Sequence, residues 1–186
     1  MTPKKIFICI LLGICTYGCK DKKRAYLIDE ITPPLGDSVV SMTFTGDLLF
    51  EQGLYDSLDD YDFGTYFDQI KPYLKGDIVI GNQEIPIGGE ELGVSGVAFT
   101  FNAPKKVADQ LPEIGFDIMS VATNHSYDMG YQGVFNTLKH LHDNGIATFG
   151  LYAQKEDKDQ IYVIEKHGIR IALLAYTYDT NEWIEP

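Results

Sequence analysis

The residues of this chain that could carry out chemistry form three short polar groups, each directly after an apolar run. They are Gly46-Asp47 after VVSMTFT, Asn82-Gln83-Glu84 after DIVIG, and Asn124-His125 after FDIMSVAT. Carboxylate, amide and imidazole groups are oxygen and nitrogen donors for divalent metal ions. Open α/β folds bind their ligands at the sheet edge where the strands end. The pattern therefore predicts part of a metal centre at one edge of a sheet.

Each polar group also has a plainer structural explanation. Asp47 at a strand-to-helix junction is a good helix N-cap, and considered alone it favours that role. Glu84 is harder to explain in this way because Glu is not a preferred turn residue, whereas Asn82 either forms a turn or supplies a second donor. His125 carries the strongest signal, since Asn124 precedes it and the letters SYDMG follow. A core histidine bonded to the backbone is the alternative.

The remaining histidines and a late polar segment carry weaker signals. His140 and His142 flank Leu141 on an expected helix and cannot both face its apolar side, so a surface position is expected for at least one. His167 falls in an expected hairpin turn, and none of the three is assigned to the site. Residues 176–181 (YTYDTN) either reach the same sheet edge or form an ordinary polar loop.

Apolar periodicity places strands and helices in alternation, which predicts an α/β fold with a mostly parallel sheet. Strands are expected over residues 39–45, 77–81, 117–122 and 146–149, and a β-hairpin over 161–165 and 169–176. Helical spacing predicts a helix over 63–74, a second beginning near Pro104, and a third through Val134, Leu138 and Leu141 that Gly145 caps. Residues 88–96 are expected to form a glycine-rich loop, and 97–101 a short extended segment.

The N-terminus has the pattern of an export signal. Two lysines precede the apolar run IFICILLGICTYG, which is shorter than a membrane-spanning helix requires. It ends in TYGC, which resembles the lipobox of a bacterial lipoprotein, so residues 1–18 are expected to be the signal peptide and Cys19 the lipidated residue. An ordinary secretory signal is the alternative. Residues 19–38 are expected to form a polar tether, and 39–186 a single domain.

Cysteine content and charge exclude two classes of site. Cys9, Cys15 and Cys19 all lie in the signal segment, so a metal in the domain must be held by oxygen and imidazole. The chain has a formal net charge of −12, and its dense basic run, residues 20–24, lies beside the expected anchor. Proteins that bind phosphate backbones need a cationic stripe, so nucleic acid is not an expected partner.

The order and spacing of longer motifs resemble the CapA family of capsule and poly-γ-glutamate synthesis proteins. The matching segments are FTGDLLF, IVIGNQEIPIGG, FTFNAPKKVADQLPEIGFDIMSVATNHSYDMGYQGVFNTLKHLHDNGIATFG and GIRIALLAYTYDTN, from about residue 39 to 181. That family is similar to calcineurin-like metallophosphatases. The resemblance implies a metallophosphatase-like β-sandwich flanked by helices, around a site for two divalent ions of the Mn or Zn type.

The resemblance also implies a role for each polar group. Asp47 would bind a metal, Glu84 would be the carboxylate shared between two metals, and Asn124 would bind through its amide oxygen. His125 would be the catalytic residue that contacts the scissile ester or amide group. Asp128 would either orient His125 or hold the turn that follows, the turn being favoured.

The chain departs from the family pattern in three places. Thr123 stands where the family usually has an asparagine, and Gln83 stands where an apolar residue is common, between Asn82 and Glu84. The family's second half, with its Gly-His-x-His-like segment, does not follow, so the domain is expected to be truncated after its first half. A metal site made of one Asp, one Glu and one Asn has few nitrogen donors, so weak binding of transition metals is expected.

These features together predict an extracytoplasmic lipoprotein, anchored to a membrane of the cell envelope, that acts on an anionic polymer, either poly-γ-glutamate or capsule. Metal-dependent hydrolysis of an ester or amide bond is the first hypothesis. A non-catalytic component that binds polymer for a synthase complex is the second. An inactive gene fragment is the third, in which an unpaired apolar edge such as 171–175 predicts aggregation.

Overall fold

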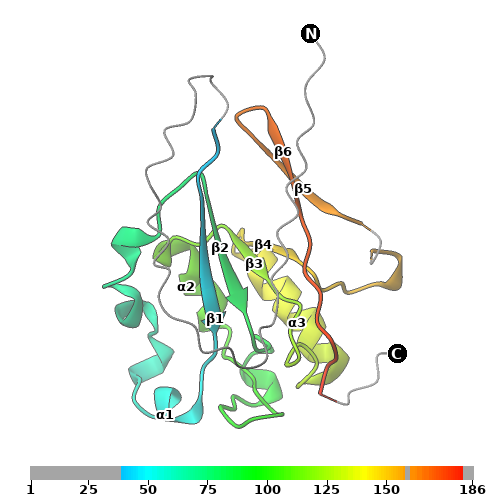
Figure 1. The fold of residues 1–186 in the computed structure, drawn as a ribbon. Helices are drawn as coiled ribbons and strands as arrows, with labels where there is room; N and C mark the ends of the chain where they lie inside the picture. The colour runs from blue at the N-terminus through cyan, green and yellow to red at the C-terminus, as the bar shows by residue number, and fades with distance from the viewer. Residues whose placement is uncertain (1–38, 158–159, 182–186) are drawn as a thin grey trace, which may run out of the picture.

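The computed structural model describes residues 39–157 and 160–181 (Figure 1). The expected signal peptide, the tether and Cys19 lie outside these residues. The main sheet consists of β1 Met42–Leu48, β2 Ile78–Gln83, β3 Ile118–Ser120 and β4 Ala147–Phe149. The longer helices are α2 Lys106–Ile114 and α3 Gly130–Asp143, and the hairpin is β5 Tyr162–Lys166 and β6 Ile169–Leu173. The short elements are α1 Gln52–Tyr55 and the 3-10 turns η1 Asp59–Tyr61, η2 Gly64–Phe67, η3 Lys71–Tyr73, η4 Glu90–Leu92 and η5 Lys155–Asp157.

The strands of the main sheet lie in chain order, β1-β2-β3-β4, and all run in parallel. Asn82 is therefore paired with Asp47 of β1 on one side and with Ser120 of β3 on the other. A shift of register between Phe44 and Asp47 interrupts the ladder of β1. Because parallel strands end at a common edge, the polar residues at their carboxyl ends meet there.

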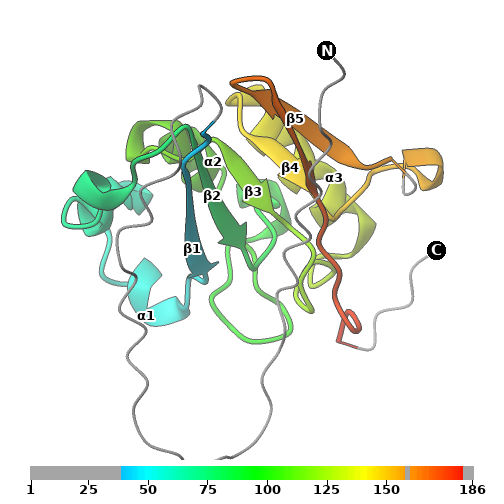
Figure 2. The same cartoon turned by 45° about the horizontal axis from the view of Figure 1, so that its top comes forward.

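The two faces of the main sheet pack against different elements. Val79 and Met119 lie in the larger core, which the apolar residues of α2 and α3 complete. Ile80 and Ile118 lie in a second, smaller core together with Leu173 of the hairpin. The hairpin and the helices therefore cover opposite faces, as the two views of the ribbon show (Figures 1 and 2). This confirms the predicted α/β fold, with a parallel sheet flanked by helices.

One predicted helix is wrong. Residues 63–74 form the two 3-10 turns η2 and η3 instead of a single α-helix. Pro72 lacks a backbone N–H and restricts the residue before it, which prevents a continuous α-helix through this segment. The apolar spacing still serves packing, because Phe63 is buried with its ring centroid 4.8 Å from that of Phe50.

The segment 97–101 also differs from the prediction, since it forms a turn and not an extended strand. An antiparallel bridge between Ser95 and Asn102 brings the two ends of the segment together. The Thr100 N–H donates to the Val97 carbonyl oxygen over 3.1 Å inside the turn. Its β-branched and aromatic residues favour extended backbone locally, but the bridge between its flanks requires the chain to reverse.

The limits of several strands differ from those predicted by a few residues. β1 and β2 extend further than expected, so Asp47 and Asn82 lie inside strands and not in the turns after them. β6 ends earlier, at Leu173. Gly145 ends α3 as predicted, with φ of +76° and its N–H donating to the His142 carbonyl oxygen over 3.0 Å. Within the described residues, no helix has the length and apolar character needed to cross a membrane.

Candidate metal centre at the carboxyl edge of the sheet

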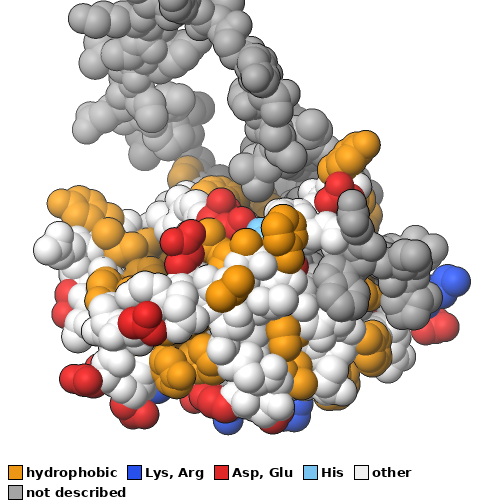
Figure 3. Space-filling view, turned by 90° about the horizontal axis from the view of Figure 1, so that it is seen from below, with side chains coloured by type: hydrophobic (Ala, Val, Ile, Leu, Met, Phe, Trp, Pro, Cys, Tyr) orange, Lys and Arg blue, Asp and Glu red, His pale blue; other side chains and the backbone are white. Residues whose placement is uncertain are grey.

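The predicted polar groups meet at the carboxyl edge of the main sheet. Asp47 and Asn82 occupy paired positions on β1 and β2, and Asn82 Nδ2 donates to Asp47 Oδ1 over 2.7 Å. Asn124 and His125 lie in the loop after β3, and both are half-buried. Viewed from this edge, acidic side chains lie beside a small histidine surface, with hydrophobic side chains around them (Figure 3).

Glu84 follows β2 directly and is half-buried. Burial raises the pKa of its carboxyl group, and the charge of Asp47 raises it further, whereas the proximity of His125 lowers it. The three side chains are therefore close enough to influence one another electrostatically. Two carboxylates that repel each other at one place are favourable ligands for a cation, because the positive charge relieves the repulsion.

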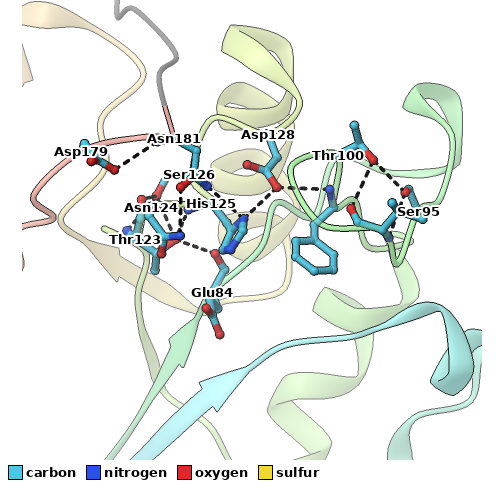
Figure 4. Close-up of polar contacts among 12 residues, drawn as sticks. Glu84, Ser95, Thr100, Thr123, Asn124, His125, Ser126, Asp128, Asp179 and Asn181 are labelled. Atoms are coloured by element: carbon cyan, nitrogen blue, oxygen red, sulfur yellow. Dashed lines mark hydrogen bonds and ion pairs between the residues drawn. The ribbon is translucent and has the colours of Figure 1, made fainter. Parts of the chain in front are cut away.

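Asp128 holds His125 from the buried side. Its Oδ2 lies 2.9 Å from His125 Nδ1, and its side chain is fully buried while that of His125 is 12% exposed. When Nδ1–H donates to the carboxylate, the ring is fixed in orientation and Nε2 is left free for a ligand or a proton. The same Oδ2 accepts the Phe101 N–H over 3.2 Å, so Asp128 also joins the loop after β3 to the turn before α2 (Figure 4).

Hydroxyl groups fix the loop after β3. Thr123 Oγ1 donates to the Glu84 carbonyl oxygen over 2.5 Å and accepts the His125 N–H over 3.1 Å. Ser126 Oγ accepts the Thr123 N–H and donates to the Val121 carbonyl oxygen, both over 2.8 Å. Thr123, one of the departures from the family pattern, therefore connects the end of β2 to the loop that carries His125.

Asn181 reaches the site from the segment after β6. Its Oδ1 accepts a hydrogen bond from Asn124 Nδ2 over 3.2 Å, and its Nδ2 lies 3.2 Å from His125 Nδ1 (Figure 4). The Asn181 N–H in turn donates to Asp179 Oδ1 over 3.2 Å. Of the two interpretations of residues 176–181, the structure supports the one that brings the segment to the sheet edge. Asn181 was absent from the predicted site, and its only sequence signal was its place after the last strand.

Two phenylalanines border His125. The ring of buried Phe101 meets the imidazole edge-on, with centroids 4.9 Å apart. The ring of exposed Phe99 has its centroid 6.3 Å from that of the imidazole. Their place at the site depends on how the turn 97–101 folds back, and the sequence did not distinguish them from ordinary packing residues.

The other histidines lie away from this edge. His140 is buried, and its Nδ1 lies 2.8 Å from the Ile87 carbonyl oxygen. His142 is exposed and its Nε2 lies 2.9 Å from Thr148 Oγ1, so one histidine of the pair is at the surface as expected. His167 lies in the hairpin turn between β5 and β6.

The donors at this edge fit part of a divalent-metal site. Asp47, Glu84 and Asn124 offer carboxylate and amide oxygens of the kind that Mg²⁺ and Mn²⁺ prefer. Across residues 39–157 and 160–181, however, no three His, Cys, Asp or Glu side chains are grouped so that they could hold a metal ion. The described donors therefore do not fill a coordination sphere by themselves.

Comparison with known proteins identifies the family. The family described as "Bacterial capsule synthesis protein PGA_cap" matches residues 41–186, which is most of the chain. The chain belongs to this family. The resemblance to CapA proteins that the motifs indicated is therefore confirmed, and the α/β fold agrees with the metallophosphatase-like superfamily to which CapA belongs.

Two CapA proteins illustrate the similarity. The chain is 27% identical over 142 residues to the "Capsule biosynthesis protein CapA" of Bacillus anthracis, a match that covers 74% of this chain and 34% of that protein. It is 24% identical over 144 residues to the "PGA biosynthesis protein CapA" of Bacillus subtilis (strain 168), covering 76% of this chain and 38% of that protein. The matched part thus spans little more than a third of either CapA protein.

Proposed function

We propose that this protein takes part in the biosynthesis or processing of an anionic envelope polymer, by metal-assisted hydrolysis of an ester or amide bond. The observation that supports this most is the His125–Asp128 pair at the same sheet edge as Asp47, Glu84 and Asn124. The relatives named for capsule and PGA biosynthesis support the polymer class, and poly-γ-glutamate is the first candidate.

Asp47, Glu84 and Asn124 would hold one or two divalent ions of the Mn or Zn type, together with ligands from outside the described residues. An ion bound there supplies activation of water as a nucleophile and stabilisation of charge on the displaced oxygen. Asn82 would keep the Asp47 carboxylate in place through its bond to Oδ1, which leaves Oδ2 for the ion.

His125 would act as the general acid that protonates the leaving group. Asp128 accepts the Nδ1–H and stabilises the imidazolium form, so that Nε2 can donate a proton to the leaving oxygen or nitrogen. The low exposure of both side chains, 12% for His125 and 0% for Asp128, limits competition by water for this pair. The edge-on ring of Phe101 closes one side of the imidazole.

Calorimetric titration with Mn²⁺ and a hydrolysis assay on poly-γ-glutamate test the proposal. We expect His125→Ala to abolish hydrolysis while ion binding is retained, and Asp47→Asn to weaken ion binding. His142→Ala is the matched control, because His142 is exposed and contacts Thr148 away from the site. Hydrolysis at an unchanged rate in His125→Ala would contradict the catalytic role.

A second candidate function is a non-catalytic component that binds polymer for a synthase complex. It is favoured by the fact that the described residues contain no group of three acidic, cysteine or histidine side chains able to hold a metal. The two functions differ in their dependence on the ion. Polymer binding that is unaffected by a chelator and by Asp47→Ala would favour the second candidate.

Export and anchoring to a membrane of the cell envelope are part of the same proposal. They are supported by the signal-like N-terminus and by the lipobox-like TYGC that ends at Cys19. We expect Cys19→Ser to move the protein from the membrane fraction to the soluble fraction of fractionated cells. An unchanged distribution would contradict lipid anchoring through this residue.

A further inference from the structure

Phe99 has an unusual backbone conformation for an exposed aromatic residue. Its φ is +65°, in the left-handed region that favours glycine, and 62% of its surface is exposed. A bulky residue in this region strains the backbone, and an exposed ring gains little from packing. Neither feature stabilises the fold, and strained residues of this kind are found at binding and catalytic sites.

The turn that carries Phe99 is closed at its base. Ser95 and Asn102 exchange two backbone hydrogen bonds, of 2.8 and 3.0 Å. Asn102 is completely buried, and its side chain bonds to the backbone of Gly88, Gly89 and Gly93. These hydrogen bonds therefore anchor the turn to the core.

Asp128 connects this turn to the candidate catalytic residue. Its Oδ2 accepts the Phe101 N–H over 3.2 Å and lies 2.9 Å from His125 Nδ1. Phe99 lies two residues before Phe101, with its ring centroid 6.3 Å from the imidazole. One buried carboxylate thus contacts both His125 and the backbone of the turn that carries Phe99.

We propose that Phe99 forms the apolar wall of a substrate subsite beside His125, where it contacts the methylene groups of a γ-linked glutamyl chain. This inference rests on the proposed function. The face of an aromatic ring is electron-rich, so it attracts C–H groups and disfavours carboxylates. A γ-linked glutamyl chain offers runs of methylene groups between its carboxylates, which matches such a wall.

The charges of the protein and the polymer also favour separate contacts for the carboxylates and for the methylene groups. The polymer is anionic and the chain has a net charge of −12, so the two repel each other wherever no cation lies between them. The carboxylates of the polymer would be directed to the ion held at Asp47 and Glu84 and to the amide of Asn181. Methylene contacts at Phe99 add affinity that does not depend on charge.

Phe99→Gly separates binding from folding. Glycine adopts φ of +65° without strain, so this variant removes the ring and relieves the backbone together. We expect its thermal midpoint to be unchanged or higher than that of the native chain. We expect its affinity for poly-γ-glutamate oligomers in Zn²⁺-containing buffer, measured by calorimetry, to fall about tenfold. Phe99→Trp should retain binding, and Val97→Ala is the control, because Val97 is exposed on the same turn without a ring.

The contact itself is read by saturation-transfer NMR. Saturation of aromatic protein protons should reach the methylene protons of the oligomer in the native chain, and this transfer should be lost in Phe99→Gly. Native affinity in Phe99→Gly would overturn the subsite while leaving the proposed function intact. A large fall in its thermal midpoint would show that Phe99 is structural. Equal or stronger transfer to a uronic-acid oligosaccharide of matched charge would assign the wall to a glycan instead. If the native chain binds neither polymer, with or without Zn²⁺, the proposed function fails together with the subsite.

Discussion

Asn181 Nδ2 lies 3.2 Å from His125 Nδ1, although 56 residues separate the two in the chain. The same side chain accepts a hydrogen bond from Asn124, the expected amide ligand. Because the Asn124 amide nitrogen is occupied by Asn181, its oxygen is oriented away from that contact and is available to an ion. The segment after β6 therefore holds Asn124 by a hydrogen bond and packs against His125, whose Nδ1–H is directed to Asp128.

Asn181→Ala should loosen Asn124, and remove a neighbour of the His125 ring, without unfolding the protein. Removing the amide takes away contacts that orient ligands, and such losses typically cost about 10- to 100-fold in metal affinity. We expect weaker Mn²⁺ binding by calorimetry, and shifted NMR resonances of the Asn124 side-chain amide and the His125 ring even without metal. Thr177→Ala is the control, since its hydroxyl donates to the Asp179 carbonyl oxygen in the same segment. Unmoved resonances would show that Asn181 has no positioning role.

Asp128→Asn should destabilise the protein while keeping the shape of the site. The Phe101 N–H and His125 Nδ1 both contact Oδ2, so the amide oxygen of the variant must take that place. The amide nitrogen then falls where Oδ1 is buried without a hydrogen-bond partner among the described residues. A buried unsatisfied donor costs about 1–3 kcal/mol, which urea unfolding would measure. A stability equal to that of the native chain would mean that this nitrogen finds a partner.

The contribution of Glu84 to the free energy of unfolding should fall as pH rises through the range in which this carboxyl group ionises. The pKa of Glu84 in the fold lies above its ordinary value of 4.5, mainly because of burial and then because of Asp47. The native state therefore binds this proton more tightly than the unfolded state, and the associated stability is present at low pH and lost above the folded pKa. Relative to the native chain, Glu84→Gln should gain thermal stability on going from acidic to neutral pH.

Divalent ions provide the matching test for Glu84. If the carboxylate is a ligand, Mn²⁺ should raise the thermal midpoint of the native chain at neutral pH, because binding to the folded state stabilises it. The same ion should raise the midpoint of Glu84→Gln much less. An equal rise in both proteins would place the ion elsewhere.

Asp77 should show the opposite pH dependence. Hydrogen bonds from the Ser41 N–H and hydroxyl, both 2.8 Å long, lower the pKa of Asp77 below its ordinary 3.8. His167 contributes to the same shift from the hairpin turn. The stability that Asp77 contributes through this shift is present above its unfolded pKa and is lost as pH falls through its folded pKa. Asp77→Asn should therefore be less stable than the native chain at neutral pH, and the difference should vanish in strong acid. Asp68→Asn, a change in a surface pair with Lys71, is the control.

Gly96 should not tolerate a side chain. A Cβ at this position would lie 1.9 Å from the Gln52 backbone nitrogen and 2.4 Å from the Glu51 carbonyl carbon. The backbone cannot move aside as a flexible side chain can. Gly96→Ala should therefore lower the free energy of unfolding, measured with denaturant, by about 1–3 kcal/mol. Gly53→Ala, which meets no atom within 4 Å, should be nearly neutral. Similar losses in both variants would contradict the close approach.

The strands and the donor residues at their ends were predictable because their signals are local. Apolar runs such as DIVIG are continuous in sequence and end in polar residues, so they indicate a buried parallel strand and a donor at its end without knowledge of the rest. Asp47, Asn82 and Glu84 followed from this reasoning. The family resemblance was equally available, because it depends on the order and spacing of motifs along the chain.

The features that the sequence did not reveal have two causes: a proline inside a helical pattern, and contacts between distant segments. Pro72 converted a helical pattern into 3-10 turns whose aromatic residues still reach the core, and the bridge from Ser95 to Asn102 folded an apparently extended segment into the turn that presents Phe99. The types of residue and their order and spacing along the chain determined that it is an α/β member of its family, with carboxylate, amide and imidazole donors at the ends of its strands. Only the tertiary structure decided that Asn181 and Phe99 lie beside His125, because the contacts that place them there form only after the sheet, the turn and the segment after β6 have come together.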